Sequence, residues 1–134
     1  SRALRELCDE ARILAFVHKD GRTYQRIQFR LWHWGDRTFA MRFPSDAQLL
    51  SVKVHDRWLG RLDTQERDSQ QLLTLPFDQN TEFVRYEILV RREAGALLLP
   101  GAMQVSAPRI DWPIQPADLQ VRWFLEGGLT PLRQ

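Results

Sequence analysis

Hydrophobic and polar side chains alternate along three consecutive stretches between positions 23 and 54. The apolar positions are Ile27, Phe29 and Leu31, then Phe39, Met41 and Phe43, then Leu50, Val52 and Val54. An apolar residue at every second position is typical of a β-strand with one buried face. Turn residues, Gly35-Asp36 and Pro44-Ser45-Asp46, separate the three stretches. The pattern therefore predicts three antiparallel strands that share one core.

The same reasoning extends the prediction to the rest of the chain. Residues 12–19 are predicted to form a first strand, followed by a two-residue hairpin at Asp20-Gly21, where Gly and Asp tolerate positive φ, and by a long strand over 23–34. Further strands are expected over 72–76, 81–92, 96–99, 103–106 and 119–126, and His55 to Gly60 is expected to form a hairpin tip with a short outgoing arm. Residues 63–71 are polar and show no alternation, which predicts a solvated loop.

The N-terminal residues follow a different spacing. Leu4, Leu7, Cys8 and Ala11 recur at helical intervals, which predicts a short helix or a frayed tail over residues 1–10. Residues 11–134 are then expected to form one domain, which we interpret as part of a larger protein. A chain of 134 residues removes roughly two thirds of its unfolded surface from water, which is enough for a stable core.

Turn signals at intervals of roughly 8 to 12 residues favour an all-β antiparallel sandwich of seven to nine strands, of the Greek-key or immunoglobulin-like kind. A closed barrel is the alternative. The predicted core consists of Ile27, Phe29, Leu31, Phe39, Met41, Phe43, Val52, Val54, Val84, Tyr86, Ile88, Val121 and Trp123.

Composition narrows the classes of partner and cofactor. The formal net charge is +2, and no run of five or six like charges occurs, which argues against a nucleic-acid partner. No apolar run approaches the roughly 20 residues of a membrane-spanning helix, so we expect no membrane contact by this segment. Cys8 is the single cysteine, which excludes an internal disulfide and a cysteine-based metal site. Phosphate-binding glycine loops are absent, and we expect no cofactor.

Tryptophans supply the main candidate binding surface. Trp32 and Trp34 occupy even-numbered positions of the predicted strand, whereas the apolar face uses the odd-numbered positions Ile27, Phe29 and Leu31. The two indoles are therefore predicted to point outward, beside Gln28 and Arg30. Trp58 is predicted at a loop tip. Exposed aromatic rings with polar neighbours stack on sugars or anchor protein partners. The alternative is that a bulge at Gly35 or the second sheet covers them. Trp112 and Trp123 are predicted to belong to the core.

Catalytic signals are weak. The three histidines, His18, His33 and His55, fall on different predicted strands, and no HxH or HExxH spacing occurs. No GxSxG motif marks a nucleophilic serine. A catalytic triad assembles in space, so a hydrolase remains an alternative hypothesis.

Several segments together resemble a known group of proteins. These are the turn Lys19-Asp20-Gly21-Arg22, the elements Phe39-x-Met41-Arg42-Phe43-Pro44 and Leu73-Thr74-Leu75-Pro76, and the stretches Pro108-x-Ile110-Asp111-Trp112-Pro113-Ile114 and Val121-x-Trp123-x-Leu125. This order is similar to β-rich segments of large, uncharacterised, membrane-anchored proteins of bacterial envelopes. The chain departs from that group at His55-Asp56-Arg57-Trp58 and at Trp32-His33-Trp34.

The resemblance implies a periplasmic or extracellular location, with the cytoplasm as the alternative, and a role as a binding or spacer module. The first hypothesis is therefore a non-catalytic interaction or structural module whose partner is a protein or a neighbouring domain of the same chain. Carbohydrate binding through Trp32, Trp34 and Trp58 is the second hypothesis, and a hydrolase is the third.

Overall fold

The computed structural model describes residues 4–92 and 110–125, which fold into a β-sandwich of two sheets. The strands are β1 (Leu7–Val17), β2 (Thr23–Trp32), β3 (Thr38–Pro44), β4 (Ala47–Val54), β5 (Arg57–Trp58), β6 (Asp63–Arg67), β7 (Gln70–Pro76), β8 (Phe83–Arg92) and β9 (Leu119–Leu125). The prediction of an all-β sandwich of seven to nine strands is confirmed.

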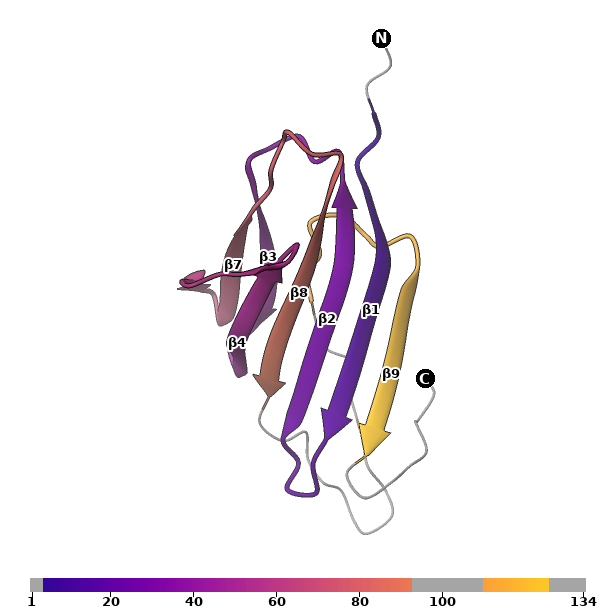
Figure 1. Cartoon of the computed structure of the whole chain (residues 1–134). Coiled ribbons are helices and arrows are strands. Elements are labelled where there is room, and N and C mark those ends of the chain that lie inside the picture. Colours follow the sequence, from indigo (N-terminus) through magenta and orange to yellow (C-terminus); the bar gives the residue numbers. More distant parts are fainter. Residues whose placement is uncertain (1–3, 93–109, 126–134) are drawn as a thin grey trace.

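The larger sheet has six strands in the order β5-β4-β8-β2-β1-β9, and the smaller sheet has the order β3-β7-β6 (Figure 1). All neighbouring strands are antiparallel except β1 and β9, which run parallel. The purely antiparallel arrangement that the sequence predicts is therefore wrong at this edge. A parallel neighbour needs a long crossover connection, which the chain between β8 and β9 is long enough to supply.

The core lies between the two sheets. Phe29 and Tyr86 of the larger sheet stack at 5.1 Å, and Phe39 of the smaller sheet meets the Tyr86 ring edge-on at 4.9 Å. The Tyr86 hydroxyl also donates a hydrogen bond of 2.6 Å to the Pro76 carbonyl on β7. All predicted core residues are buried except Val54 and Val121, which are partly buried and pack against the core.

The predicted N-terminal helix is wrong. Residues from Leu7 onward belong to β1, which is five residues longer at its start than the segment beginning at Arg12 that the alternation indicates. The helical spacing is a consequence of a β-bulge, which brings both Cys8 and Ala11 to the core face although they are three residues apart. Within the described residues no helix is long and apolar enough to cross a membrane.

The loop predicted over 63–71 is also wrong, because it contains β6 and the start of β7. Every residue of β6 is exposed, so the strand carries no buried apolar face that could produce an alternating pattern. Asp68 and Ser69 form the turn to β7 with φ of 53° and 63°. Positive φ at both central residues is characteristic of a type I′ hairpin turn.

Other predicted boundaries shift slightly. The β1–β2 connection spans residues 18–22 rather than two residues, and its Gly21 has φ 90°. The long second strand ends at Trp32, and the outgoing arm after His55 is the two-residue β5, as predicted. The strands predicted over 96–99 and 103–106 lie outside the described residues.

Candidate functional site

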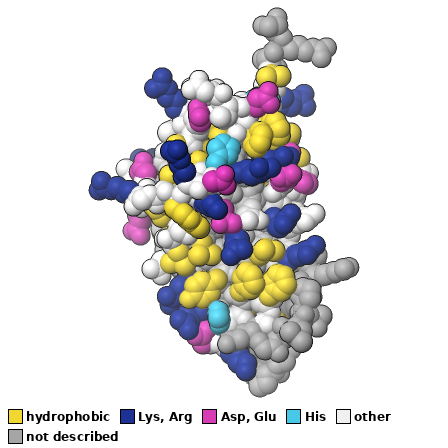
Figure 2. All heavy atoms as spheres, in the orientation of Figure 1, with side chains coloured by type: hydrophobic (Ala, Val, Ile, Leu, Met, Phe, Trp, Pro, Cys, Tyr) yellow, Lys and Arg dark blue, Asp and Glu magenta, His cyan; other side chains and the backbone are white. Residues whose placement is uncertain are grey.

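The outer face of the six-stranded sheet points away from the smaller sheet and carries the predicted surface residues. Gln28, Arg30 and Trp32 alternate on β2 with the buried Ile27, Phe29 and Leu31, so they project from this outer face. Figure 2 shows the face: charged side chains of both signs crowd its upper part, and a band of hydrophobic side chains crosses it below.

A β-bulge in β1 shapes the upper part of this face. Asp9 pairs with Arg30 and Arg12 pairs with Gln28, so two residues of β1, Glu10 and Ala11, oppose a single residue of β2. Glu10 adopts φ 47° at the bulge. Such bulges bend a strand and re-aim its side chains. Here the result is that Asp9, Glu10 and Arg12 can all lie toward the outer face while Cys8 and Ala11 stay buried.

Asp9 connects the two neighbouring outward residues of β2. Arg30 donates from Nε and Nη2 to the two carboxylate oxygens of Asp9 at 2.9 and 2.8 Å, and the Trp32 Nε1–H donates to Asp9 Oδ1 at 2.8 Å. These donors lower the pKa of the Asp9 carboxyl, and the hydrogen bond from Arg30 is the largest cause. A bidentate pair of this kind fixes the orientation of both side chains.

Aromatic rings extend this cluster onto β8. Phe83 is the cross-strand partner of Trp32, and their ring centroids lie 4.7 Å apart. The Arg30 guanidinium carbon lies 5.1 Å from the Trp32 ring and 5.6 Å from the Phe83 ring, and the Arg85 guanidinium lies 5.3 Å from Phe83. We call Arg30, Trp32, Phe83 and Arg85 the aromatic-arginine cluster.

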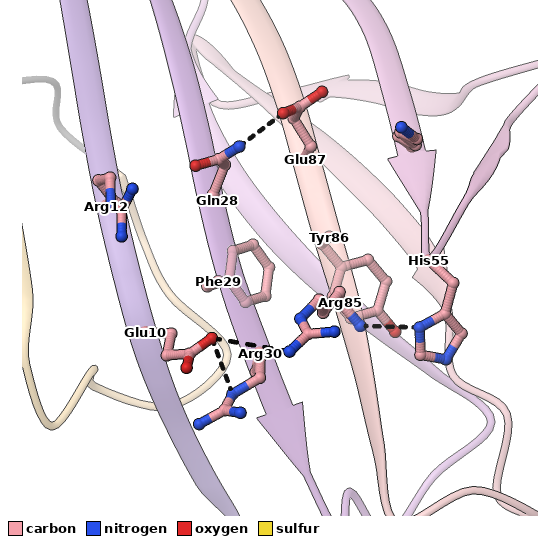
Figure 3. A pocket seen from close by; sticks show the side chains of 10 residues that line it. Glu10, Arg12, Gln28, Phe29, Arg30, His55, Arg85, Tyr86 and Glu87 are labelled. Atoms are coloured by element: carbon pink, nitrogen blue, oxygen red, sulfur yellow. Dashed lines mark hydrogen bonds and ion pairs between the residues drawn. The ribbon is translucent and has the colours of Figure 1, made fainter.

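A polar pocket of about 260 Å³, the central pocket, lies beside the cluster (Figure 3). Its floor includes Phe29 and Tyr86, whose rings are buried in the core on the other side. The other lining residues are outward side chains of β1, β2, β4 and β8, together with His55 in the turn after β4: Glu10, Arg12, Gln28, Arg30, Lys53, His55, Arg85 and Glu87. They form two cross-strand rows, because Gln28 pairs with Arg12 and with Glu87, and Glu87 pairs with Lys53.

Arg30 and Arg85 belong to the second row, and Glu10 lies between them. Arg30 and Arg85 are direct cross-strand partners, which places two like charges opposite each other. Glu10 Oε2 lies 3.3 Å from Arg30 Nε and 4.0 Å from Arg85 Nη2, so one carboxylate bridges both guanidinium groups. In the other row, Gln28 Nε2 donates to Glu87 Oε1 at 2.7 Å.

The three candidate tryptophans do not form one platform. Trp32 lies on the outer face and is half-buried, whereas Trp34 packs against the core and donates from Nε1 to the Thr38 carbonyl at 3.0 Å. The predicted outward orientation of Trp34 does not hold because His33, at φ 52°, redirects the chain after β2 ends. Trp58 is 59% exposed on β5, where Lys53 Nζ lies 5.4 Å from its ring.

Trp123 is buried, as predicted, and Trp112 is partly buried with its ring edge-on to Phe29 at 5.2 Å. The histidines contact different aromatic rings: His18 lies against Tyr24, His33 against Trp32 and His55 against Phe83. No group of three or more His, Cys, Asp or Glu side chains suited to a metal ion occurs among the residues described.

The Cys8 thiol is poorly suited to nucleophilic chemistry. The residue is fully buried, and burial together with the nearby Asp9 and Asp118 carboxylates raises the pKa of Cys8 to about 12. The thiolate is the reactive form of cysteine, and it is scarcely populated near neutral pH at such a pKa.

Sequence reasoning missed most of the residues that complete this surface. Asp9 and Glu10 fall in the segment predicted to be a tail or a short helix, and Phe83, Arg85 and Glu87 fall in the strand predicted over 81–92, with no role in binding. The sequence does carry one signal. Phe83 is a large aromatic residue on the side of the strand opposite to Val84, whose side is apolar throughout. The pairing of β2 with β8, which brings these residues beside Trp32, joins segments more than 50 residues apart.

Comparisons with known proteins give little further information. No protein-family model and no curated protein matches the chain. Among solved structures, the crystal structure of Legionella pneumophila aminopeptidase A in complex with aspartic acid aligns with 67% of this chain and 11% of that one, at 12% identity and a TM-score of 0.48. The similarity is too low to carry an argument about fold or activity.

Proposed function

We propose that this chain is a non-catalytic interaction module of a larger bacterial envelope protein, and that it binds a protein partner or a neighbouring domain through the outer face of its six-stranded sheet. The assignment to an envelope protein rests on the sequence resemblance. The immunoglobulin-like class of sandwich that the sequence predicts would suit such a role, because it presents a broad sheet face.

The observation that carries the proposal is the aromatic-arginine cluster. Trp and Arg are the residue types most enriched at the energetic centres of protein interfaces. Here Asp9 holds Arg30 and Trp32 in fixed orientations before any partner arrives. Side chains that are already ordered lose less conformational entropy on binding, which favours association.

The indoles favour a protein partner over a sugar. Stacking on a pyranose ring needs accessible indole faces, and Trp34 packs against the core while Trp32 contacts Phe83 and Arg30. Trp58 is exposed but lies on β5, three strands away from Trp32 on β2 in the order of the sheet. Neighbouring strands are about 4.8 Å apart, so the two indoles are too far from each other to hold one sugar ring.

Site-specific photo-crosslinking tests the proposal. A photoreactive phenylalanine analogue replaces Phe83 in the protein that contains this chain, and the same analogue replaces Gln65 on β6 as the matched exposed control in the other sheet. We expect irradiation of intact cells to give a discrete crosslinked product, within or between chains, for position 83 and none for position 65. Equal crosslinking at both positions, or none at position 83, would contradict the proposal.

A further inference from the structure

We infer that the central pocket binds the carboxylate of an acidic side chain, presented by an extended segment of the protein partner. This inference rests on the proposed function and specifies the chemistry of the partner. It starts from the charges that line the pocket.

Cationic side chains outnumber carboxylates around the central pocket. Arg12, Arg30, Lys53 and Arg85 line it together with Glu10 and Glu87. When Asp9, which pairs with Arg30, is included, four cations still face three carboxylates. The excess is one positive charge, half of the net charge of +2 that the whole chain carries, and it lies around a single pocket.

Two of the cations have no carboxylate partner among the residues that the structure describes. No carboxylate of the described residues lies within 4.0 Å of Arg12 or of Lys53, and Lys53 Nζ lies 5.4 Å from the centre of the Trp58 ring. Within the described part of the chain, the one ion pair of Arg85 is the long contact of 4.0 Å to Glu10, and the Arg85 side chain is 58% exposed. These three groups surround the pocket from β1, β4 and β8, so an incoming anion would meet cations on several sides.

Glu10 demonstrates that a carboxylate fits this environment. Its Oε2 lies between the guanidinium groups of Arg30 and Arg85, while half of its side chain remains exposed. Arg–carboxylate pairs are among the stronger polar contacts in proteins. Arg12 on β1 and Arg85 on β8 lie on two sides of the pocket with β2 between them, so a partner carboxylate that enters it would meet a guanidinium group from either strand (Figure 3).

A protein segment fits better than a nucleic acid or a small anion. Asp9, Glu10 and Glu87 lie on the same face, and a chain of regularly spaced phosphates would meet these like charges as well as the arginines. Beside the pocket, the parts of Trp32 and Phe83 that stay exposed offer an aromatic surface for an apolar side chain of the same segment. Protein interfaces combine an apolar centre with polar contacts around it, and this surface offers both.

The experiment uses the 134-residue chain and a synthetic peptide of ten glutamates at low ionic strength. We expect saturable NMR shifts confined to the central pocket, including the side-chain Nε–Hε signals of Arg12 and Arg85. Arg12→Ala and Arg85→Ala should each weaken binding about tenfold, whereas Arg67→Ala, an equal charge change on exposed β6, should leave it unchanged. Glu10→Gln should tighten binding, because it removes the competing carboxylate.

Several results would overturn the inference. Equal weakening by Arg67→Ala would show unspecific charge attraction, and equal binding of a ten-lysine peptide would contradict the charge argument. Binding of inorganic phosphate or polygalacturonate, but not of the glutamate peptide, would indicate a different ligand class. If the peptide fails while crosslinking at position 83 succeeds, the inference is wrong and the interaction module stands. If the peptide does not bind and position 83 gives no crosslink, both the carboxylate pocket and the interaction module are wrong.

Discussion

Arg30 and Asp9 are cross-strand partners that form a bidentate ion pair, with distances of 2.9 and 2.8 Å from Nε and Nη2 to the carboxylate oxygens. Both side chains are largely shielded, at 19% and 22% exposure. The pair orients Arg30 over the Trp32 ring, and Asp9 also accepts the indole N–H. One carboxylate thus fixes two residues of the proposed binding surface.

Asp9→Asn should destabilise the domain near neutral pH by about 1.5–3 kcal/mol, the range for hydrogen bonds to a charged group. The folded pKa of Asp9 is lowered below its ordinary value of 3.8. Its stabilising effect is therefore complete above the unfolded pKa and is lost as pH falls through the folded pKa. Urea denaturation at a series of pH values should show the two proteins converging below about pH 4. Asp36→Asn, at an exposed turn, is the control and should be nearly neutral.

Glu10 occupies a left-handed backbone conformation, with φ 47°, that non-glycine residues adopt at a cost. Glu10→Ala and Glu10→Gly both remove the carboxylate that bridges Arg30 and Arg85, but only alanine keeps a Cβ atom. We expect the glycine variant to be more stable than the alanine variant by about 1 kcal/mol in chemical denaturation. The reverse order would show that the bulge conformation is not maintained in solution.

Tyr86 joins the two sheets through its hydroxyl, which donates to the Pro76 carbonyl at 2.6 Å while the residue is 2% exposed. Tyr86→Phe should lower the free energy of unfolding by about 1 kcal/mol, because the hydrogen bond that links the two sheets is lost. Tyr24→Phe, on the partly exposed outer face, provides the comparison and should change stability little. Equal effects of the two substitutions would argue against the link between the sheets.

Trp58 is the most accessible of the three candidate indoles, and its side chain lies over Lys53. Trp58→Phe should remove most of the fluorescence that acrylamide quenches readily, whereas Trp34→Phe should leave that fraction nearly unchanged. Stern–Volmer plots of the two variants and the unaltered chain measure the difference. A large loss of quenching in Trp34→Phe instead would contradict the packing of this indole against the core.

Alternation of hydrophobic residues was enough to predict the fold where a strand has one buried and one solvated face. It identified β2, β3, β8 and β9 closely, because in each of them a one-residue shift would expose the core side chains. In β4 it found the strand but not the bulge between Leu49 and Ser51, and Leu50, expected on the apolar face with Val52 and Val54, is exposed. It failed for β6, whose two faces are both exposed, and for the start of β1, where the bulge interrupts the period of two. Local sequence does not encode a strand whose stability comes from its neighbour's hydrogen bonds.

The sequence by itself placed Gln28, Arg30 and Trp32 on one outer face, because side chains alternate along any strand. It did not determine which strands lie beside them. The pairing of β2 with β1 and β8 brings Asp9, Glu10, Phe83 and Arg85 to the same surface, and the bulge aims Glu10 between two arginines. The redirected backbone at His33 withdraws Trp34 from it. These features depend on contacts between distant segments, so only the tertiary structure decided them.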